Sequence, residues 1–500
     1  MIFAVVAAAI VVLMSAYLVH RTGMYQFWNW FSIFETSVLI YCGIIMLIAS
    51  ACLLWKKKIK PEVVFSGLAL GLGLAFLLVI TPLSPPDEQY HYSITYKIAN
   101  LLMLNERPDL VYADYESLIP HYNTASGYIR ILTEFGGRMP DDAVFSPYNQ
   151  NAAYWVCYLP QVVGVLCGRL LNRNFITLFI FGRFINLLFY ACCVYFAVKS
   201  IPRFKTLLGM IAIMPMALHQ AASFSTDSFI NGMSFIIIAY AFKMIWTTEI
   251  IPLHDIIVST AIAILLAPAK VVYCSLFLLF FLIPWENFGS KSKKLKMLCV
   301  MFVLAAAFAM VIQFSSILSI THNPDSLLNW EGQENYNLDF VFAHPLQTLV
   351  IFWNSFVFWC KTWLLQAVGS TLCGLNLFVN IYVIMAYFAT IMLCAYESSS
   401  NGIKIDTRIR ALCLIIVACV ILLTMASMFL GWTSNTRTII VGVQGRYFIP
   451  VFPLLILPLS IRKVRIPEKL MNLSIILASG LNVFIIAELL FETLDRKSVV

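Results

Sequence analysis

Two adjacent carboxylates, Asp87 and Glu88, lie in the sequence Ser-Pro-Pro-Asp-Glu-Gln-Tyr-His at 84–91, directly after an apolar stretch. A carboxylate at the edge of a membrane span can remove the proton of a sugar hydroxyl, so each is a candidate general base. If Ser84 caps a helix that begins at Pro85, Asp87 and His91 share one helix face. The alternative is structural, because acidic residues stabilise helix N-termini and Ser-x-x-Asp resembles a capping box.

Four more ionisable residues occur at the edges of apolar stretches: Arg183, Asp227, Lys270 and Arg446. Such groups are costly at membrane depth and commonly functional. Acids and cations that converge there suit an anionic lipid-phosphate ligand. The alternative is that the basic side chains reach toward water, or that Asp227 forms a structural salt bridge with an arginine.

Metal and nucleic-acid chemistry find little support in the sequence. The 13 cysteines lie mostly inside apolar runs, without a CxxC pair or a Cys/His spacing typical of zinc. We therefore expect no metal site and no cofactor, while a divalent metal is not excluded. The net charge of +8 is spread over short clusters instead of one basic face, which argues against a nucleic-acid partner.

The composition identifies the class of protein. Hydrophobic residues make up 61% of the 500 and charged residues only 12%, about half of what a soluble domain carries. Many apolar runs reach the length of a transmembrane helix. The sequence predicts an all-α polytopic bundle of roughly 13 spans, at Met1–His20, Ile33–Trp55, Val63–Thr81, Phe175–Val198, Leu207–Ala222, Phe229–Trp246, Ile256–Ala267, Val271–Pro284, Met297–Ile320, Phe378–Cys394, Ala411–Gly431, Phe448–Ile461 and Leu470–Leu490.

The basic clusters predict the orientation of these spans. They lie between apolar runs at Lys56–Lys60, Lys199–Lys205, Lys291–Lys296, Lys404–Arg410 and Arg462–Lys469. The positive-inside rule makes them cytoplasmic and the acidic loop Pro82–Gln150 external. The count of crossings then requires two apolar stretches not to cross: Tyr154–Leu171, expected to be juxtamembrane or re-entrant, and the aromatic-rich Leu346–Leu365, expected in the interface.

The chain divides into three parts on these grounds. Residues 1–60 form an extra N-terminal hairpin, residues 61–460 the main module with its external loop at 82–150, and residues 461–500 a C-terminal span and tail. No soluble domain or internal repeat is evident.

The order of several short segments resembles a known family. The segments are Pro85-Pro86-Asp87-Glu88-x-x-His91, Tyr158-Leu159-Pro160-Gln161-x-x-Gly164 with Gly168-Arg169, Gly182-Arg183-x-x-Asn186, Met214-Pro215-Met216 through Ser225-x-Asp227, Lys270-x-x-Tyr273 and Gln444-Gly445-Arg446-Tyr447-Phe448-x-Pro450. Together they are similar to the bacterial membrane-protein family known as domain of unknown function 2142, within the GT-C glycosyltransferase superfamily. The resemblance spans roughly Val63 to Ser460 and leaves the N-terminal hairpin out.

The resemblance implies a GT-C-like bundle and a glycosyltransferase, usually inverting, that takes sugars from a polyprenyl phosphate. In that superfamily an acidic residue of the first external loop is the base, which here is Asp87 or Glu88. Three cations become candidates for the donor phosphate: Arg183, Lys270 and Arg446. His91, Asp227 and Tyr273 become candidates for positioning donor or acceptor. The sequence departs from the superfamily at Asn151-Ala152-Ala153-Tyr154, where many members carry an Asn-Pro-Pro-Leu-like or His-Pro-Pro-like stretch.

The expected reaction therefore moves a sugar from a polyprenyl-phosphate donor to an extracytoplasmic cell-envelope glycan or lipid-linked acceptor. The expected location is the bacterial plasma membrane, with membrane lipids as further partners. Two other functions remain open: a transporter or flippase of lipid-linked glycans, which intramembrane charges also fit, and a non-catalytic scaffold in envelope assembly.

Overall fold

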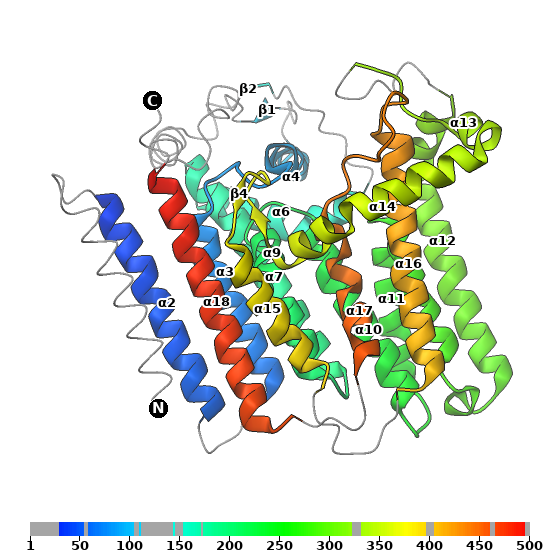
Figure 1. Ribbon diagram of the computed structural model, residues 1–500, viewed down its shortest axis with the longest axis horizontal. Helices are drawn as coiled ribbons and strands as arrows, with labels where there is room; N and C mark the ends of the chain where they lie inside the picture. The colour runs from blue at the N-terminus through cyan, green and yellow to red at the C-terminus, as the bar shows by residue number, and fades with distance from the viewer. Residues whose placement is uncertain are drawn as a thin grey trace.

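The protein is a bundle of helices in a computed structural model (Figure 1). The structure describes residues 30–54, 59–104, 110–111, 144–145, 154–171, 174–322, 332–396, 405–460 and 466–495. The predicted span Met1–His20 and most of the external loop at 82–150 lie outside the described residues. The only strands among those described form two short antiparallel pairs, so the described part is mostly helical, as predicted.

Eight helices of the described part are long and apolar enough to cross a membrane. They are α2 (Trp30–Leu54), α3 (Pro61–Val79), α7 (Phe175–Ser200), α10 (Asp227–Trp246), α12 (Lys291–His322), α14 (Pro345–Val368), α16 (Thr407–Gly431) and α18 (Glu468–Asp495). Seven of them coincide with predicted spans, with the helix ends shifted by a few residues, whereas α14 falls on Leu346–Leu365, which was predicted to lie in the interface.

Shorter elements complete the bundle. They are α4 (Glu88–Leu102), β1 (Leu110–Val111), β2 (Val144–Phe145), η3 (Trp155–Tyr158), α6 (Leu159–Leu170), α8 (Lys205–Ala212), α9 (Pro215–Ala221), α11 (Leu253–Leu266), η4 (Val271–Leu282), η5 (Trp285–Phe288), α13 (Leu338–Ala343), β3 (Thr371–Leu372), β4 (Leu377–Phe378), α15 (Ile381–Cys394), η7 (Gly445–Val451), α17 (Phe452–Ile456) and η8 (Leu457–Leu459). The η elements are 3-10 helices. A 3-10 helix rises about 2.0 Å per residue, against about 1.5 Å in an α-helix. The 12 residues of η4 therefore span a distance for which an α-helix would need more residues.

Successive elements run up and down the bundle, which separates its two ends (Figure 1). The starts of α3, α8, α12, α16 and α18 lie toward the base of the view. Each of these starts contains or borders described basic residues of one of the five clusters, at Lys60, Lys205, Lys291, Arg408 and Lys469. The opposite end holds α4, α13 and the starts of α7 and α10. One face of the bundle is therefore basic, and the acidic segment before α4 belongs to the other.

The two stretches predicted not to cross the membrane correspond to α6 and α14. The 12-residue α6 is too short to cross a bilayer at about 1.5 Å per residue. The 24 residues of α14 are long enough, yet α14 lies steeply across α16 and α12 at the end opposite the basic clusters (Figure 1). That α14 lies in the membrane interface stays a prediction from its aromatic residues.

A close approach joins α6 to α7. A Cβ added to Gly164 would lie 2.3 Å from the carbonyl oxygen of Phe181 and 2.8 Å from the Cα of Gly182. Only glycine allows the two backbones to come this near, which is how small residues pack membrane helices. The contact fixes α6 against the turn of α7 that precedes Arg183.

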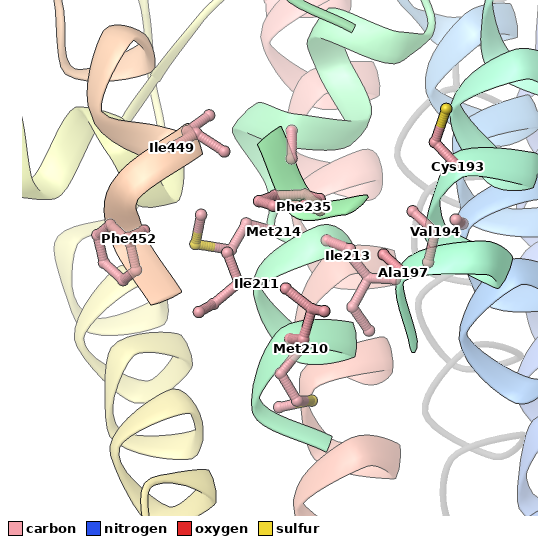
Figure 2. Packing of buried hydrophobic residues seen from close by; sticks show 14 of the residues in the cluster. Cys193, Val194, Ala197, Met210, Ile211, Ile213, Met214, Phe235, Ile449 and Phe452 are labelled. Carbon is pink, nitrogen blue, oxygen red and sulfur yellow. The ribbon is translucent and has the colours of Figure 1, made fainter. Parts of the chain in front are cut away.

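The predicted span Leu207–Ala222 is wrong as a single helix. The chain breaks between α8 and α9, where Pro215 cannot donate to the preceding turn. Figure 2 shows Met210, Ile211, Ile213 and Met214 at this break, packed between side chains of α7 and α17. The break is therefore buried, and its carbonyl groups have no access to water.

Side chains of three other helices bind those carbonyls. The hydroxyl of Tyr190 on α7 donates to Ala212 at 2.8 Å, and the hydroxyl of Tyr387 on α15 donates to Ile213 at 2.8 Å. The amide of Asn482 on α18 also donates to Ile213, at 3.1 Å. A helix break inside a membrane is stable only when neighbours satisfy it in this way.

Candidate functional site

A buried ion pair lies beneath the loop that carries Asp87. Glu88 and Arg183 are both excluded from solvent, and their side chains meet in two parallel bonds, Nε to Oε1 at 2.9 Å and Nη2 to Oε2 at 2.6 Å. The remaining donors of Arg183 go to backbone carbonyls at the end of α3, including Ile80 at 2.7 Å and Thr81 at 3.2 Å. All the donors of Arg183 are therefore occupied.

The same carboxylate organises two loops. The backbone N–H of Leu83 donates to Glu88 Oε2 at 2.7 Å, and that of Phe224 donates to Oε1 at 3.0 Å. Leu83 precedes Asp87, whereas Phe224 precedes Asp227. Glu88 thus holds together the two segments that supply the acidic groups of the site.

Two sequence predictions are corrected by this geometry. Glu88 is unsuited to be the base, because its carboxylate is buried and accepts four hydrogen bonds. Arg183 is unsuited to bind a donor phosphate, because its guanidinium has no free donor. Both residues are buried, and each supplies the opposite charge and hydrogen bonds that the other needs inside the protein.

Asp87 has the opposite environment. Its side chain is 61% exposed and forms an ion pair with Arg446, Oδ2 to Nη2 at 2.9 Å. The helix begins at Glu88 and not at Pro85, and Asp87 precedes it in the left-handed conformation, with φ 61°. The hydroxyl of Ser84 donates to the Thr81 carbonyl at 2.8 Å, so the predicted Ser84 cap is wrong.

The left-handed conformation turns the side chain of Asp87 away from its own helix. The carboxylate makes no capping bond to the start of α4. Aspartate tolerates this conformation better than most residues, but it still carries a cost that commonly marks a functional position. Asp87 is thereby presented to solvent beside Arg446.

Asp227 links the two cations of the site. It contacts Lys270 Nζ through Oδ1 at 3.2 Å and Arg446 Nη1 through Oδ2 at 3.5 Å. Lys270 also lies over the ring of Tyr447, 4.1 Å from its centroid. Lys270 is 36% exposed, whereas Arg446 is 4% exposed. The structure therefore gathers Asp87, Asp227, Lys270 and Arg446 from four distant segments.

A polar network fixes the position of Asp227. The amide of Asn186 on α7 donates to the carbonyl of Ser223 at 2.7 Å, and its oxygen accepts from the Ser228 hydroxyl at 2.6 Å. The amide of Gln161 on α6 donates to Phe224 and Ser225, each at 3.3 Å. These bonds satisfy the backbone of a buried turn that has no regular structure of its own.

The two remaining predicted residues, His91 and Tyr273, border the site. Nδ1 of His91 pairs with the Tyr158 hydroxyl at 2.9 Å, and burial lowers the pKa of His91 to about 4. His91 therefore carries a neutral ring, and its Nδ1 bonds to Tyr158. Tyr273 is buried, and its hydroxyl donates to the Tyr447 carbonyl at 2.9 Å. It positions Tyr447, and its prediction as a ligand contact is corrected.

Sequence reasoning missed Tyr447 and the structural network around Asp227. Tyr447 directly follows Arg446 in the chain, and this adjacency to a predicted site residue could have identified it. Among the described residues, no group of three or more His, Cys, Asp or Glu side chains is placed to hold a metal ion.

A family model described as predicted membrane protein (DUF2142) matches residues 142–455, more than half of the chain. The chain belongs to this family. The DUF2142 match includes Asp227, Lys270 and Arg446, whereas Asp87 lies before it. The chain matches no curated protein and no solved structure.

Proposed function

We propose that the protein is a membrane glycosyltransferase of the GT-C type, with Asp87 as its base. The observation that carries the proposal is an exposed carboxylate in contact with a buried arginine, which shares Asp227 with a second cation. The donor is a sugar on a polyprenyl phosphate. The acceptor is an extracytoplasmic cell-envelope glycan or lipid-linked glycan.

The proposed reaction is a direct displacement. Asp87 takes the proton of the acceptor hydroxyl, whose oxygen attacks the anomeric carbon. The bond between that carbon and the phosphate oxygen breaks, and the phosphate leaves with the electron pair. The side chains of Lys270 and Arg446 stabilise the charge on the leaving phosphate. Attack opposite the leaving group inverts the anomeric centre.

The Asp87–Arg446 pair gives donor binding a role in activating the base. A cation beside a carboxylate favours its charged form and weakens it as a base. A donor phosphate would compete with Asp87 for Arg446, whose Nε has no hydrogen-bond partner in the described part of the chain. Donor binding would then release Asp87 to accept a proton.

Sugar transfer by purified protein tests the proposal. Polyprenyl-phosphate sugars that accumulate in a strain lacking the protein serve as donors, and membranes of that strain serve as acceptor. Asp87→Asn should insert normally and lose roughly two to four orders of magnitude in rate. Asp339→Asn makes the same chemical change at an exposed position of α13 and is the control.

Two results would contradict the proposal. Full activity of Asp87→Asn would remove Asp87 as the base. Movement of intact lipid-linked sugar across vesicles, without a new glycosidic bond, would instead identify a transporter.

A further inference from the structure

The backbone of the segment before Arg446 is held by side chains instead of by regular secondary structure. Residues 440–444 have no helix or strand structure, yet they lie among apolar helices and lead directly into η7. Backbone groups of such a segment need partners from elsewhere. Most of the partners come from one edge of α14, and the N–H of Val441 donates to the Thr433 hydroxyl at 3.2 Å.

Four side chains of α14 bind this segment, at positions 355, 359, 363 and 366. The Ser355 hydroxyl accepts from the N–H of Ile440 at 2.8 Å, and the indole of Trp359 donates to the Ile440 carbonyl at 3.0 Å. The indole of Trp363 donates to Val443 at 3.1 Å. The Gln366 side chain accepts from the N–H of Gly445 at 3.0 Å.

The spacing of these four residues places them on one face of the helix, since positions three and four apart are neighbours. The sequence therefore places a row of four side chains along α14 that forms hydrogen bonds with the backbone of the segment. The last of these bonds is made to Gly445, the residue immediately before Arg446.

Gly445 shows how tightly the segment is held. A Cβ at this position would lie 2.2 Å from the carbonyl oxygen of Trp363 and 2.6 Å from the N–H nitrogen of Ala367. Both neighbours are backbone atoms of a helix and cannot give way. Any side chain larger than hydrogen would separate the segment from α14.

The other side of Arg446 is held by η4, through the bond from the Tyr273 hydroxyl to the Tyr447 carbonyl. The guanidinium of Arg446 is thus placed by contacts before and after it in the chain. A long side chain that must face Asp87 and Asp227 together needs such a fixed origin.

We propose that Ser355, Trp359, Trp363 and Gln366 are positioning residues that set Arg446 against Asp87 and Asp227. They contact the Arg446 segment, and their effect on any ligand passes through Arg446. The consequence for a donor phosphate rests on the proposed function, whereas the positioning itself does not.

Trp363→Phe tests the row because it removes the indole N–H and keeps an aromatic ring. Trp353→Phe is the matched control, since Trp353 lies on the same helix with its side chain 65% exposed. Hydrogen–deuterium exchange of the full-length protein should rise for amides 440–446 in Trp363→Phe and Gly445→Ala. It should not rise in Trp353→Phe, nor in α16 of any variant.

A second measurement separates positioning from general loss of structure. In the transfer assay, Trp363→Phe should raise KM for the polyprenyl-phosphate donor about threefold to tenfold, as expected for loss of one hydrogen bond. Its kcat should fall as well, because Arg446 also stabilises the charge on the leaving phosphate. A variant that merely unfolds in part would lose kcat with KM unchanged.

Each outcome decides a different point. Unchanged exchange in both Trp363→Phe and Gly445→Ala would overturn the positioning proposal, whatever the protein does. Raised exchange with an unchanged KM in an active enzyme would overturn the link from the row to Arg446. If the wild type transfers no sugar, the proposed function fails, and the exchange measurement alone decides the positioning.

Discussion

Asp87 and Glu88 are neighbours in the chain, yet their carboxylates lie in opposite environments. Asp87 is exposed and contacts Arg446 from η7, whereas Glu88 is fully buried and contacts Arg183 from α7. The buried pair holds the backbone on which the exposed one sits. The proposed base and the buried carboxylate that holds its loop are therefore adjacent residues.

The first prediction separates these two carboxylates by stability. Glu88→Gln leaves the Arg183 guanidinium buried without a counter-charge, which should lower the free energy of unfolding by about 3–5 kcal/mol. Asp87→Asn breaks a pair whose acidic partner is largely exposed, so its loss should be under about 1 kcal/mol. Thermal unfolding in detergent measures both. Equal losses would contradict the assignment of Glu88 as the structural member.

The second prediction concerns orientation in the membrane. The basic face should be cytoplasmic, so a cysteine at Leu104, beyond α4, should react with an impermeant thiol reagent in intact cells. A cysteine at Ser292, in the basic cluster at the start of α12, should react only after lysis. The unsubstituted protein sets the background from its 13 native cysteines. The reverse pattern would place the site in the cytoplasm.

The third prediction concerns the contact between α6 and α7. Gly164→Ala inserts a methyl group against the backbone of Phe181, which should lower the melting temperature by an amount equivalent to about 1–3 kcal/mol. Gly67→Ala is the control, because nothing lies within 4 Å of the added Cβ on α3. Alanine there should be neutral or slightly stabilising. Similar behaviour of the two variants would mean that the helices are not in close contact.

The fourth prediction uses the pKa of His91, which burial lowers to about 4 from an ordinary value of 6.5. The unfolded chain binds the His91 proton more tightly, so acidification from pH 6.5 to pH 4 should favour unfolding. His91→Gln should lose this part of the pH dependence of the melting temperature. His254→Gln, at an exposed histidine, should keep it. An unchanged slope in His91→Gln would contradict a lowered pKa of His91.

The sequence was sufficient to place most of the long helices. Long apolar runs determine spans almost by themselves, because lipid leaves the backbone no alternative to helix. The basic clusters predicted which ends share a face. The gathering of Asp227, Lys270 and Arg446 follows from their common position at the opposite ends of those spans.

The pairing of particular residues was beyond the sequence. Glu88 and Arg183 are 95 positions apart, and no local pattern distinguishes a buried partner from a ligand contact. The helix start was also misplaced, because Ser84 bonds backward to Thr81 and the chain turns at Asp87. Such choices depend on which loops pack together, which only the folded molecule specifies.

The break between α8 and α9 has a consequence for the order in which the protein is made. The carbonyl of Ile213 is bound by Tyr387 and by Asn482, which lies 269 residues further along the chain. Because synthesis proceeds from the N-terminus, the carbonyl of Ile213 gains these two hydrogen bonds only after α15 and α18 have been made. A chain that stops before α18 would leave a buried backbone group of the central bundle with one of its two bonds missing, and it should remain a substrate for membrane quality control.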